Sequence, residues 1–322
     1  MSGEILDVDL LKFEKGDAST KRAVVDGVMK SLENGFVYTA HDLPSSLLDD
    51  AYGKLDEFFG SANDTKGQFV AEGSHGSRGY TGLLVETAAI ADVPDFKEML
   101  NWGPDLPGGH PLRVRFPESY RQNLFPDAVV PGISETLTTF HNTLAELQRR
   151  FLRIIAVGIG CHESFFDAMV TDGSTLSRAI HYPPMDQAPD EEHIWAGAHG
   201  DINLITALPR STAKGLQVEV DGAWVDAMPP DDHVIINTGI MLEIITNGLV
   251  PIGVHRVVAD PDDSGDRLSV VQFCHPTPWT VLSPVASCVT PENPQRFGSI
   301  SAADRLAQVL YEINLIEDAR RV

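Results

Sequence analysis

The sequence has few cysteines, few positive charges and no long apolar run. Its three cysteines, Cys161, Cys274 and Cys288, never form a C-x-x-C pair. This argues against a disulfide framework or a thiolate zinc site and predicts small buried hydrophobic side chains. No apolar run approaches the roughly 20 residues that span a bilayer, and residues 1–17 lack the basic and apolar regions of a signal peptide. We therefore predict a cytoplasmic protein without a membrane partner.

Positive charge is scarce relative to negative charge. Lys plus Arg total 24 against 46 Asp plus Glu, a formal net charge of −22. Phosphate backbones and anionic lipid would repel such a chain, which predicts a small-molecule substrate and no nucleic-acid partner. Hydrophobic residues make up 43 % and charged residues 22 %, so the chain has an ordinary globular balance. The oligomeric state cannot be predicted from these features.

No repeat, low-complexity tract or long linker divides the chain, so we expect one domain over residues 1–322. It would comprise a mostly helical region at 1–111, a jelly-roll core with an inserted long helix at 112–287, and a C-terminal helical region at 288–322. Apolar residues at helical spacing predict helices over residues 23–32, 47–59, 137–155 and 302–318.

From about Leu176 the apolar period changes to two, which is typical of strands. Asp221-Gly222 lies between two alternating segments and predicts a tight hairpin. Further strands are expected over residues 35–39, 233–237, 252–258 and 268–275. Many short strands braced by helices favour a mainly β protein, a β-sandwich or jelly roll. No G-x-G-x-x-G joins a strand to a helix, which disfavours a dinucleotide-binding dehydrogenase.

Two histidines and one aspartate form a candidate metal site. His199 and Asp201 in AHGDINLITAL stand at i and i+2 of a predicted strand and would therefore share one face. His255 in PIGVHRVV lies on another predicted strand. Two imidazoles and one carboxylate are the donor set of the facial triad that suits non-haem Fe(II). The pattern alone is weak, because a chain with 11 histidines offers several such matches.

Arg267 and Ser269 would share one face of the strand that follows His255, together with Phe273. A planar guanidinium beside a hydroxyl is a suitable receptor for a carboxylate. The competing interpretation is an ordinary salt bridge with the acidic loop at 260–266.

The run from Leu176 to Pro278 resembles the isopenicillin N synthase-like family of Fe(II)/2-oxoglutarate-dependent oxygenases. The matching segments are IHYPPMDQAP, AHGDINLITAL, GLQVEVDGAWVDA, VIINTG, LEIITNG, VHRVV and RLSVVQFCHP, with looser matches at ENGFVYTAHDLP, SRGYTGLLVE, DFKEMLNWG and NLFPD. The resemblance implies a double-stranded β-helix (jelly-roll, cupin-like) core braced by N-terminal and C-terminal helices. It implies Fe(II) bound by His199, Asp201 and His255, and 2-oxoglutarate bound by Tyr182, Arg267 and Ser269, with O2 as the other co-substrate.

Two positions depart from the family pattern. Ile180 stands where relatives often have Asn, so one polar contact to the co-substrate or metal-bound group is expected to be missing. Ile240 stands where many relatives have Asp, and a loop hydrogen bond is expected to be absent. Neither departure affects the metal triad.

The family resemblance implies oxidation of a small, polar metabolite by hydroxylation, desaturation or cyclisation, with release of succinate and CO2, in specialised or antibiotic-type metabolism. Arg78 is our candidate for orienting a substrate anion, with a surface arginine as its alternative. The other candidates for substrate contact are Tyr80, Asn203, Trp195 and Phe273, although a phenylalanine there is more often core.

Two other functions stay open. The first is an oxidative cyclase of the isopenicillin N synthase type, which uses Fe(II) and O2 without 2-oxoglutarate and binds its substrate's own carboxylate at the Arg and Ser positions. The second is a non-catalytic, cupin-like metal-binding protein. The second is disfavoured because the chain keeps the whole metal triad (His199, Asp201 and His255) as well as Arg267 and Ser269.

Overall fold

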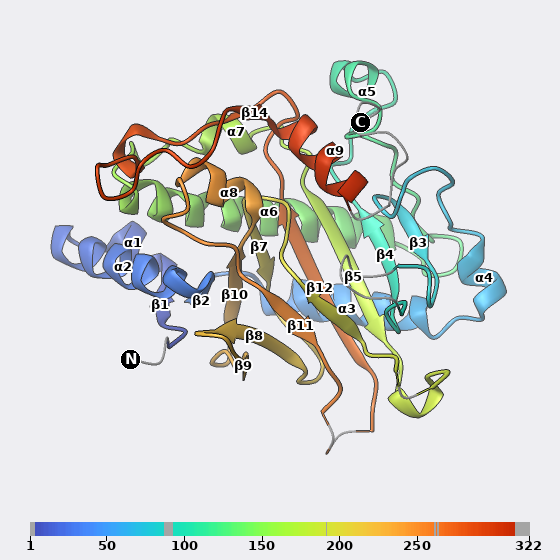
Figure 1. Cartoon of the computed structure of the whole chain (residues 1–322). Coiled ribbons are helices and arrows are strands. Elements are labelled where there is room, and N and C mark those ends of the chain that lie inside the picture. The colour runs from blue at the N-terminus through green and yellow to red at the C-terminus, as the bar shows by residue number, and fades with distance from the viewer. Residues whose placement is uncertain (1–3, 87–92, 191, 261, 263, 313–322) are drawn as a thin grey trace.

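Two β-sheets face each other, and most of the helices cover the far side of the larger one (Figure 1). The computed structural model describes residues 4–86, 93–190, 192–260, 262 and 264–312. Within these ranges the backbone hydrogen bonds define an eight-stranded sheet, a four-stranded sheet and one short strand pair. This arrangement confirms the predicted mainly β class braced by helices.

The eight-stranded sheet has the order β1-β2-β10-β7-β12-β5-β4-β3. All neighbours are antiparallel except β1 and β2. Its strands are β1 (Asp7–Asp9), β2 (Phe36–Ala40), β3 (Gly79–Thr81), β4 (Glu98–Trp102), β5 (Leu176–Tyr182), β7 (Ile205–Leu208), β10 (His233–Thr238) and β12 (Arg267–Cys274). Because β12 pairs with both β5 and β7, residues far apart in sequence lie side by side at the centre of the sheet.

The four-stranded sheet has the order β6-β11-β8-β9. Its strands are β6 (Ala196–His199), β8 (Leu216–Val220), β9 (Ala223–Asp226) and β11 (His255–Val257). The predicted hairpin is confirmed: Asp221 and Gly222 connect β8 to β9 with φ values of 51° and 78°. Positive φ at both turn positions matches the twist of the flanking strands and suits an Asp-Gly pair.

A long helix, α6 (Ile133–Gly158), crosses behind β5 and β12 (Figure 1). Its apolar stripe is buried, and Gln148 fixes it to the sheet by donating to the carbonyl oxygens of Ile205 and Gln272. The predicted long helix is therefore confirmed. The other helices are α1 (Leu10–Lys15), α2 (Ala18–Ser31), α3 (Ser45–Phe59), α4 (Asn63–Gly67), α5 (Pro111–Arg115), α7 (Asp167–Val170), α8 (Ile240–Ile245) and α9 (Ala302–Glu312).

The eight-stranded sheet has an outer face toward the helices and an inner face toward the smaller sheet. Alternation along β12 shows the division: Leu268 and Val270 belong to the core shared with the helices, whereas Arg267 and Ser269 point the other way. A second, smaller apolar core lies between the two sheets and includes Tyr182. The sites described below depend on this difference between the two faces.

The chain's first third contributes more to the sheet than its composition suggested. Residues 1–111 supply β1 to β4 in addition to helices, so position 112 does not mark the start of the β-structure. The residue pattern did not predict β1, β3 or β4, because short strands gain their stability from pairing with distant strands. At the other end α9 extends over Ala302–Glu312, and the remainder of the predicted helix lies outside the described residues. None of the described helices combines the length and apolarity needed to cross a membrane.

Candidate metal centre and co-substrate pocket

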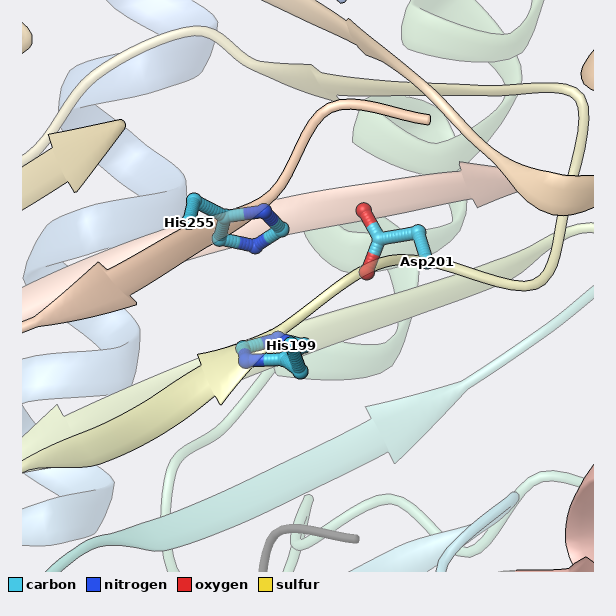
Figure 2. Close-up of side chains that lie close together, drawn as sticks. All are labelled: His199, Asp201 and His255. Carbon is cyan, nitrogen blue, oxygen red and sulfur yellow. The ribbon is translucent and has the colours of Figure 1, made fainter. Parts of the chain in front are cut away.

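His199, Asp201 and His255 converge between the two sheets (Figure 2). One potential ligand atom from each residue lies within 4.8 Å of the other two. His199 ends β6 and His255 begins β11, and the two are directly paired across the sheet. The spacing predicted that Asp201 lies on a strand, and this was wrong. Asp201 lies beyond β6, which ends at His199. The turn after β6, rather than strand alternation, brings the carboxylate to the imidazoles.

Each imidazole is oriented by its own backbone. His199 Nδ1 donates to the Gly197 carbonyl oxygen at 2.8 Å, and His255 Nδ1 donates to the Gly253 carbonyl oxygen at 3.1 Å. These bonds fix the tautomer and leave both Nε2 atoms free to coordinate a metal. At Gly253 a Cβ atom would lie 2.6 Å from the Gly35 carbonyl oxygen, so this close approach requires glycine.

The Asp201 carboxylate is buried and held by two donors. Thr206 Oγ1 donates to Asp201 Oδ2 at 2.5 Å, and Asn237 Nδ2 donates to the same oxygen at 2.7 Å. Burial alone would raise the pKa of Asp201, but His255, His199 and these two donors outweigh it and lower that pKa. Burial and the nearby His255 lower the pKa of His199 to about 4. A neutral imidazole beside an ionised carboxylate is the protonation state that metal ligation needs.

Arg267, Ser269 and Tyr182 form the candidate co-substrate pocket on the inner face. Arg267 is 1 % exposed, and its NH1 donates to Ser269 Oγ at 2.9 Å. Its guanidinium carbon lies 5.2 Å from the centre of the Tyr182 ring. Arg267 and Tyr182 are paired across β12 and β5. The structure therefore brings together the three residues expected to bind 2-oxoglutarate.

No carboxylate among the described residues lies within 4 Å of the Arg267 guanidinium. Within the described part of the acidic loop, Asp266 contacts His181 Nε2 at 3.0 Å instead. The Arg267 side chain donates to the neutral oxygens of Ser269 and Ala213. Burial lowers the pKa of Arg267 from its ordinary value. A buried cation of this kind suits an anionic guest.

Two of the candidate substrate residues, Phe273 and Trp195, lie on the side of the large sheet that faces the smaller sheet. Phe273 is half-buried on β12 and contacts the Arg178 guanidinium, 5.5 Å from its ring centre. Trp195 is buried, and its Nε1 donates to the Pro183 carbonyl oxygen at 2.9 Å. Asn203 supports the metal site instead, because its Nδ2 donates to Thr206 Oγ1 at 3.0 Å and Thr206 donates to Asp201.

Arg78 and Tyr80 lie away from the triad. The Arg78 side chain is 2 % exposed, so it is no surface arginine, and it donates to the carbonyl oxygens of Ser77, Ser119 and Arg121. Burial, together with the charge of Arg78, lowers the pKa of His141 on α6 to about 3, which places Arg78 on the helix side of the sheet. The contacts of Arg78 thus hold loops together, and nothing brings its guanidinium to the proposed metal site.

The two departures from the family pattern have different consequences. Ile180 is 8 % exposed on the inner face, between Ser269 and Met99 in register, so an apolar side chain occupies this place beside the co-substrate pocket. Ile240 begins α8, and its backbone N–H donates to the Asp201 carbonyl oxygen at 2.9 Å. The turn that carries Asp201 is therefore tied to α8 without a side-chain contribution from position 240.

Four charged residues near the metal centre were not predicted from the sequence. We call Glu86, Asp95, Lys97 and Arg178 the inner charge cluster. Lys97 Nζ contacts Glu86 at 2.7 Å and Asp95 at 2.8 Å, and Arg178 contacts Glu86 at 3.3 Å. The motif DFKEML offered acidic and basic residues, but its pattern does not show which of them point toward the metal ligands.

A second buried set lies on the opposite side of the same segment. We call Lys66, Tyr80, Glu98 and His181 the outer charge cluster. Glu98 accepts from Lys66 Nζ at 2.7 Å and from the Tyr80 hydroxyl at 2.5 Å, and contacts His181 Nδ1 at 2.8 Å. The Tyr80 hydroxyl is therefore occupied by its hydrogen bond to Glu98. Burial and the Glu98 carboxylate both raise the pKa of Tyr80. This cluster joins α4 to the sheet.

Comparison with known proteins identifies the family to which this chain belongs. The profile of the 2OG-Fe(II) oxygenase superfamily matches residues 174–276, and that of the "non-haem dioxygenase in morphine synthesis N-terminal" family matches residues 5–128. A solved 2OG-Fe(II) oxygenase family protein of Caulobacter crescentus is 34 % identical, with a TM-score of 0.85 over 97 % of this chain and 99 % of that one. The chain therefore belongs to the 2OG-Fe(II) oxygenase superfamily.

Other relatives agree with this placement. A full-length Neurospora crassa protein, solved in complex with alpha-KG, is 25 % identical with a TM-score of 0.82 over 95 % of each chain. The 2-oxoglutarate-Fe(II) type oxidoreductase hxnY of Emericella nidulans is 27 % identical over 92 % of this chain and 86 % of its own length. Isopenicillin N synthase of Flavobacterium is 30 % identical over 52 % of this chain and 53 % of its own length. The protein is accordingly an oxidoreductase with a jelly-roll fold, and the superfamily to which it belongs uses Fe(II), 2-oxoglutarate and O2.

Proposed function

We propose that His199, Asp201 and His255 bind the Fe(II), and that Arg267, Ser269 and Tyr182 bind the distal carboxylate of 2-oxoglutarate. The observation that carries the second assignment is the buried Arg267 guanidinium, which has no carboxylate partner within 4 Å among the described residues. A dicarboxylate co-substrate would supply the missing negative charge. Serine and tyrosine hydroxyls beside the guanidinium would complete its hydrogen bonds.

The residues present fit both groups. The imidazoles have free Nε2 atoms, and the Asp201 carboxylate stays ionised under two hydrogen bonds. Three protein ligands leave open positions for a chelating 2-oxo acid and O2. When bound, iron and 2-oxoglutarate supply oxidation of a C–H bond with release of succinate and CO2. The protein's part is to orient the ligands, to bind the co-substrate carboxylate through the Arg267 fork, and to place the substrate in the space between the sheets.

For the substrate we propose a small, polar metabolite, in the manner of the isopenicillin N synthase-like branch. Phe273 and Arg178 support this, because they place an aromatic ring and a guanidinium on the same inner face as Arg267 and Ser269.

The second candidate is an oxidative cyclase that does not consume 2-oxoglutarate. It is favoured by the similarity to isopenicillin N synthase over about half of each chain. In this case the substrate's own carboxylate would bind Arg267 and Ser269. We further propose that residues 1–322 act as one domain, supported by a core that includes both Leu10 and Ala302. A cytoplasmic location is supported by three cysteines without disulfides.

The test is an anaerobic titration of the full-length protein with Fe(II) and then 2-oxoglutarate, followed by absorption spectroscopy. We expect a charge-transfer band that appears when both are present, and slow succinate formation after O2 is admitted. Candidate metabolites are then screened for faster succinate release. Substrate-dependent O2 consumption without succinate would instead establish the cyclase. Failure of Fe(II) to bind, with wild-type fold, would contradict the metal assignment.

A further inference from the structure

The backbone of β6 connects the proposed iron ligand to a buried carboxylate. The carbonyl oxygen of Gly197 accepts from His199 Nδ1 at 2.8 Å. The N–H of the same residue donates to Asp95 Oδ1 at 3.0 Å. Both polar groups of one glycine are therefore used, one to orient the imidazole and the other to contact Asp95. A displacement of Asp95 would shift the segment whose carbonyl sets the rotation of the His199 ring.

Asp95 is itself held by the inner charge cluster. Lys97 Nζ contacts Asp95 Oδ2 at 2.8 Å, and the side chains of Lys97 and Asp95 are 9 % and 4 % exposed. Lys97 also contacts Glu86, and Glu86 contacts Arg178. The two oxygens of Asp95 thus have separate partners: Oδ1 accepts from the Gly197 N–H, and Oδ2 pairs with the Lys97 ammonium. This arrangement fixes the carboxylate in both position and rotation.

Glu86 and Lys97 are held in their charged forms at neutral pH. Burial would raise the pKa of Glu86, but Arg178 and Lys97 lower it to about 2. Burial would lower the pKa of Lys97, but Glu86 and Asp95 raise it above its ordinary value. Buried ion pairs of this kind add little net stability, because desolvation offsets their attraction. Their placement against β6 is better explained by positioning than by stability.

We propose that Asp95 is a positioning residue for the iron centre, which acts through the backbone of Gly197 to orient His199 and is fixed in turn by Lys97. This inference rests on the proposed assignment of His199 as a metal ligand. Groups that orient metal-bound histidines commonly change metal affinity by about 10- to 100-fold when removed. Here the orienting group is Asp95, which does not contact the imidazole and acts through the backbone of Gly197.

The test is Co(II) binding to the metal-free, full-length protein, followed by calorimetry and by the d–d absorption spectrum. We expect Asp95→Ala to weaken Co(II) binding about 10- to 100-fold and to alter the spectrum, because the His199 ring loses its fixed orientation. Asp95→Asn should recover part of the affinity, since its amide oxygen can still accept from the Gly197 N–H but its amide nitrogen cannot pair with the Lys97 ammonium. A purely structural role would leave the Co(II) spectrum of folded protein unchanged.

The matched control is Lys66→Met, which breaks an equally buried ion pair in the outer charge cluster. It should lower the thermal midpoint and leave Co(II) affinity and spectrum unchanged. Wild-type affinity in folded Asp95→Ala, an Asp95→Asn variant as weak as Asp95→Ala, or an equal loss in the control would each overturn the proposal. If Asp95→Ala does not fold, Lys97→Met decides: weakened binding supports the proposal and wild-type binding overturns it.

His199→Ala separates this inference from the one on which it rests. Loss of Co(II) binding in His199→Ala, together with wild-type binding in Asp95→Ala, would refute the positioning role alone. Wild-type Co(II) binding in His199→Ala would refute the metal assignment itself.

Discussion

Lys97 and Glu98 are neighbours in the chain, yet they belong to two different buried charge clusters on opposite sides of one segment. The inner cluster contacts β6, which carries the proposed metal ligand His199. The outer cluster joins α4 to the sheet through Lys66. Both contain buried lysine–carboxylate pairs of similar length, 2.8 Å and 2.7 Å. The comparison teaches that ionic chemistry alone does not mark function here, because the face of the sheet decides what each pair supports.

The same division applies to the sheet as a whole. Alternate residues of β12 place Leu268 and Val270 among the helices and Arg267 and Ser269 between the sheets. Substitutions on the inner face should therefore impair ligand binding in a folded protein. Substitutions on the outer face should destabilise the fold and leave ligand binding intact.

The largest effect is expected for the metal ligands. His255→Ala should abolish tight Fe(II) binding and turnover, because it removes one of the three side chains whose ligand atoms lie within 4.8 Å of one another. The fold should persist, since a β-sandwich with its own core does not require the metal as a zinc finger does. Iron content after reconstitution, together with circular dichroism, measures both quantities. Full turnover in this variant would refute the assignment.

On the outer face, Lys66→Met should reduce the free energy of unfolding by about 3 kcal/mol, because it leaves the buried Glu98 without its lysine. Urea denaturation with and without saturating Fe(II) measures this loss. Binding of 2-oxoglutarate below the unfolding transition should match the wild type. A weakened co-substrate affinity in the folded variant would show that the two faces are not independent.

Arg267→Ala should weaken 2-oxoglutarate binding by roughly ten- to a hundredfold, as expected for loss of a charge-assisted hydrogen bond of about 1.5–3 kcal/mol. Arg267→Lys should recover only part of this, because an ammonium cannot reproduce the guanidinium fork. The apparent affinity for 2-oxoglutarate in succinate formation is the measurement. An unchanged affinity in the alanine variant would favour the cyclase.

The smallest effect concerns pH and the outer cluster. Burial would lower the pKa of His181, but Glu98 and Asp266 raise it above its ordinary value of 6.5. Protonated His181 should therefore stabilise the fold below about pH 6.5, and this contribution should vanish as the pH rises through the raised pKa. His181→Gln should lose about 1 kcal/mol relative to wild type near pH 6 and little near pH 9. Urea midpoints at both pH values provide the check, and a pH-independent difference would contradict it.

Much of the site could be predicted because its residues occur in ordered local motifs. His199, Asp201 and His255 do converge, and Arg267, Ser269 and Tyr182 do lie together on one face. Strand alternation was sufficient for β12, since its whole length is regular. It was insufficient for Asp201, whose position comes from a turn that the pattern does not distinguish from a strand.

The remaining features depend on tertiary contacts between distant segments. Arg78 looked like a surface or substrate-binding residue, but packing directs it to three carbonyl oxygens on the helix side. Arg178 and Lys97 gain their importance from strands that pair only in the folded chain. No local periodicity encodes which face a charged residue takes when its partners, such as Glu86, are many residues away.

The orientation of His199 and His255 by carbonyl oxygens two residues earlier in the chain has a consequence for metal selection. These contacts shape the donor set before a cation enters, so the site has little freedom to reshape itself around one ion in preference to another. Divalent cobalt, nickel and copper generally bind nitrogen and oxygen donors more tightly than Fe(II) does. Occupancy by iron would then be decided by supply, and protein exposed to nickel should carry an inactive competitor until chelation and reloading restore Fe(II).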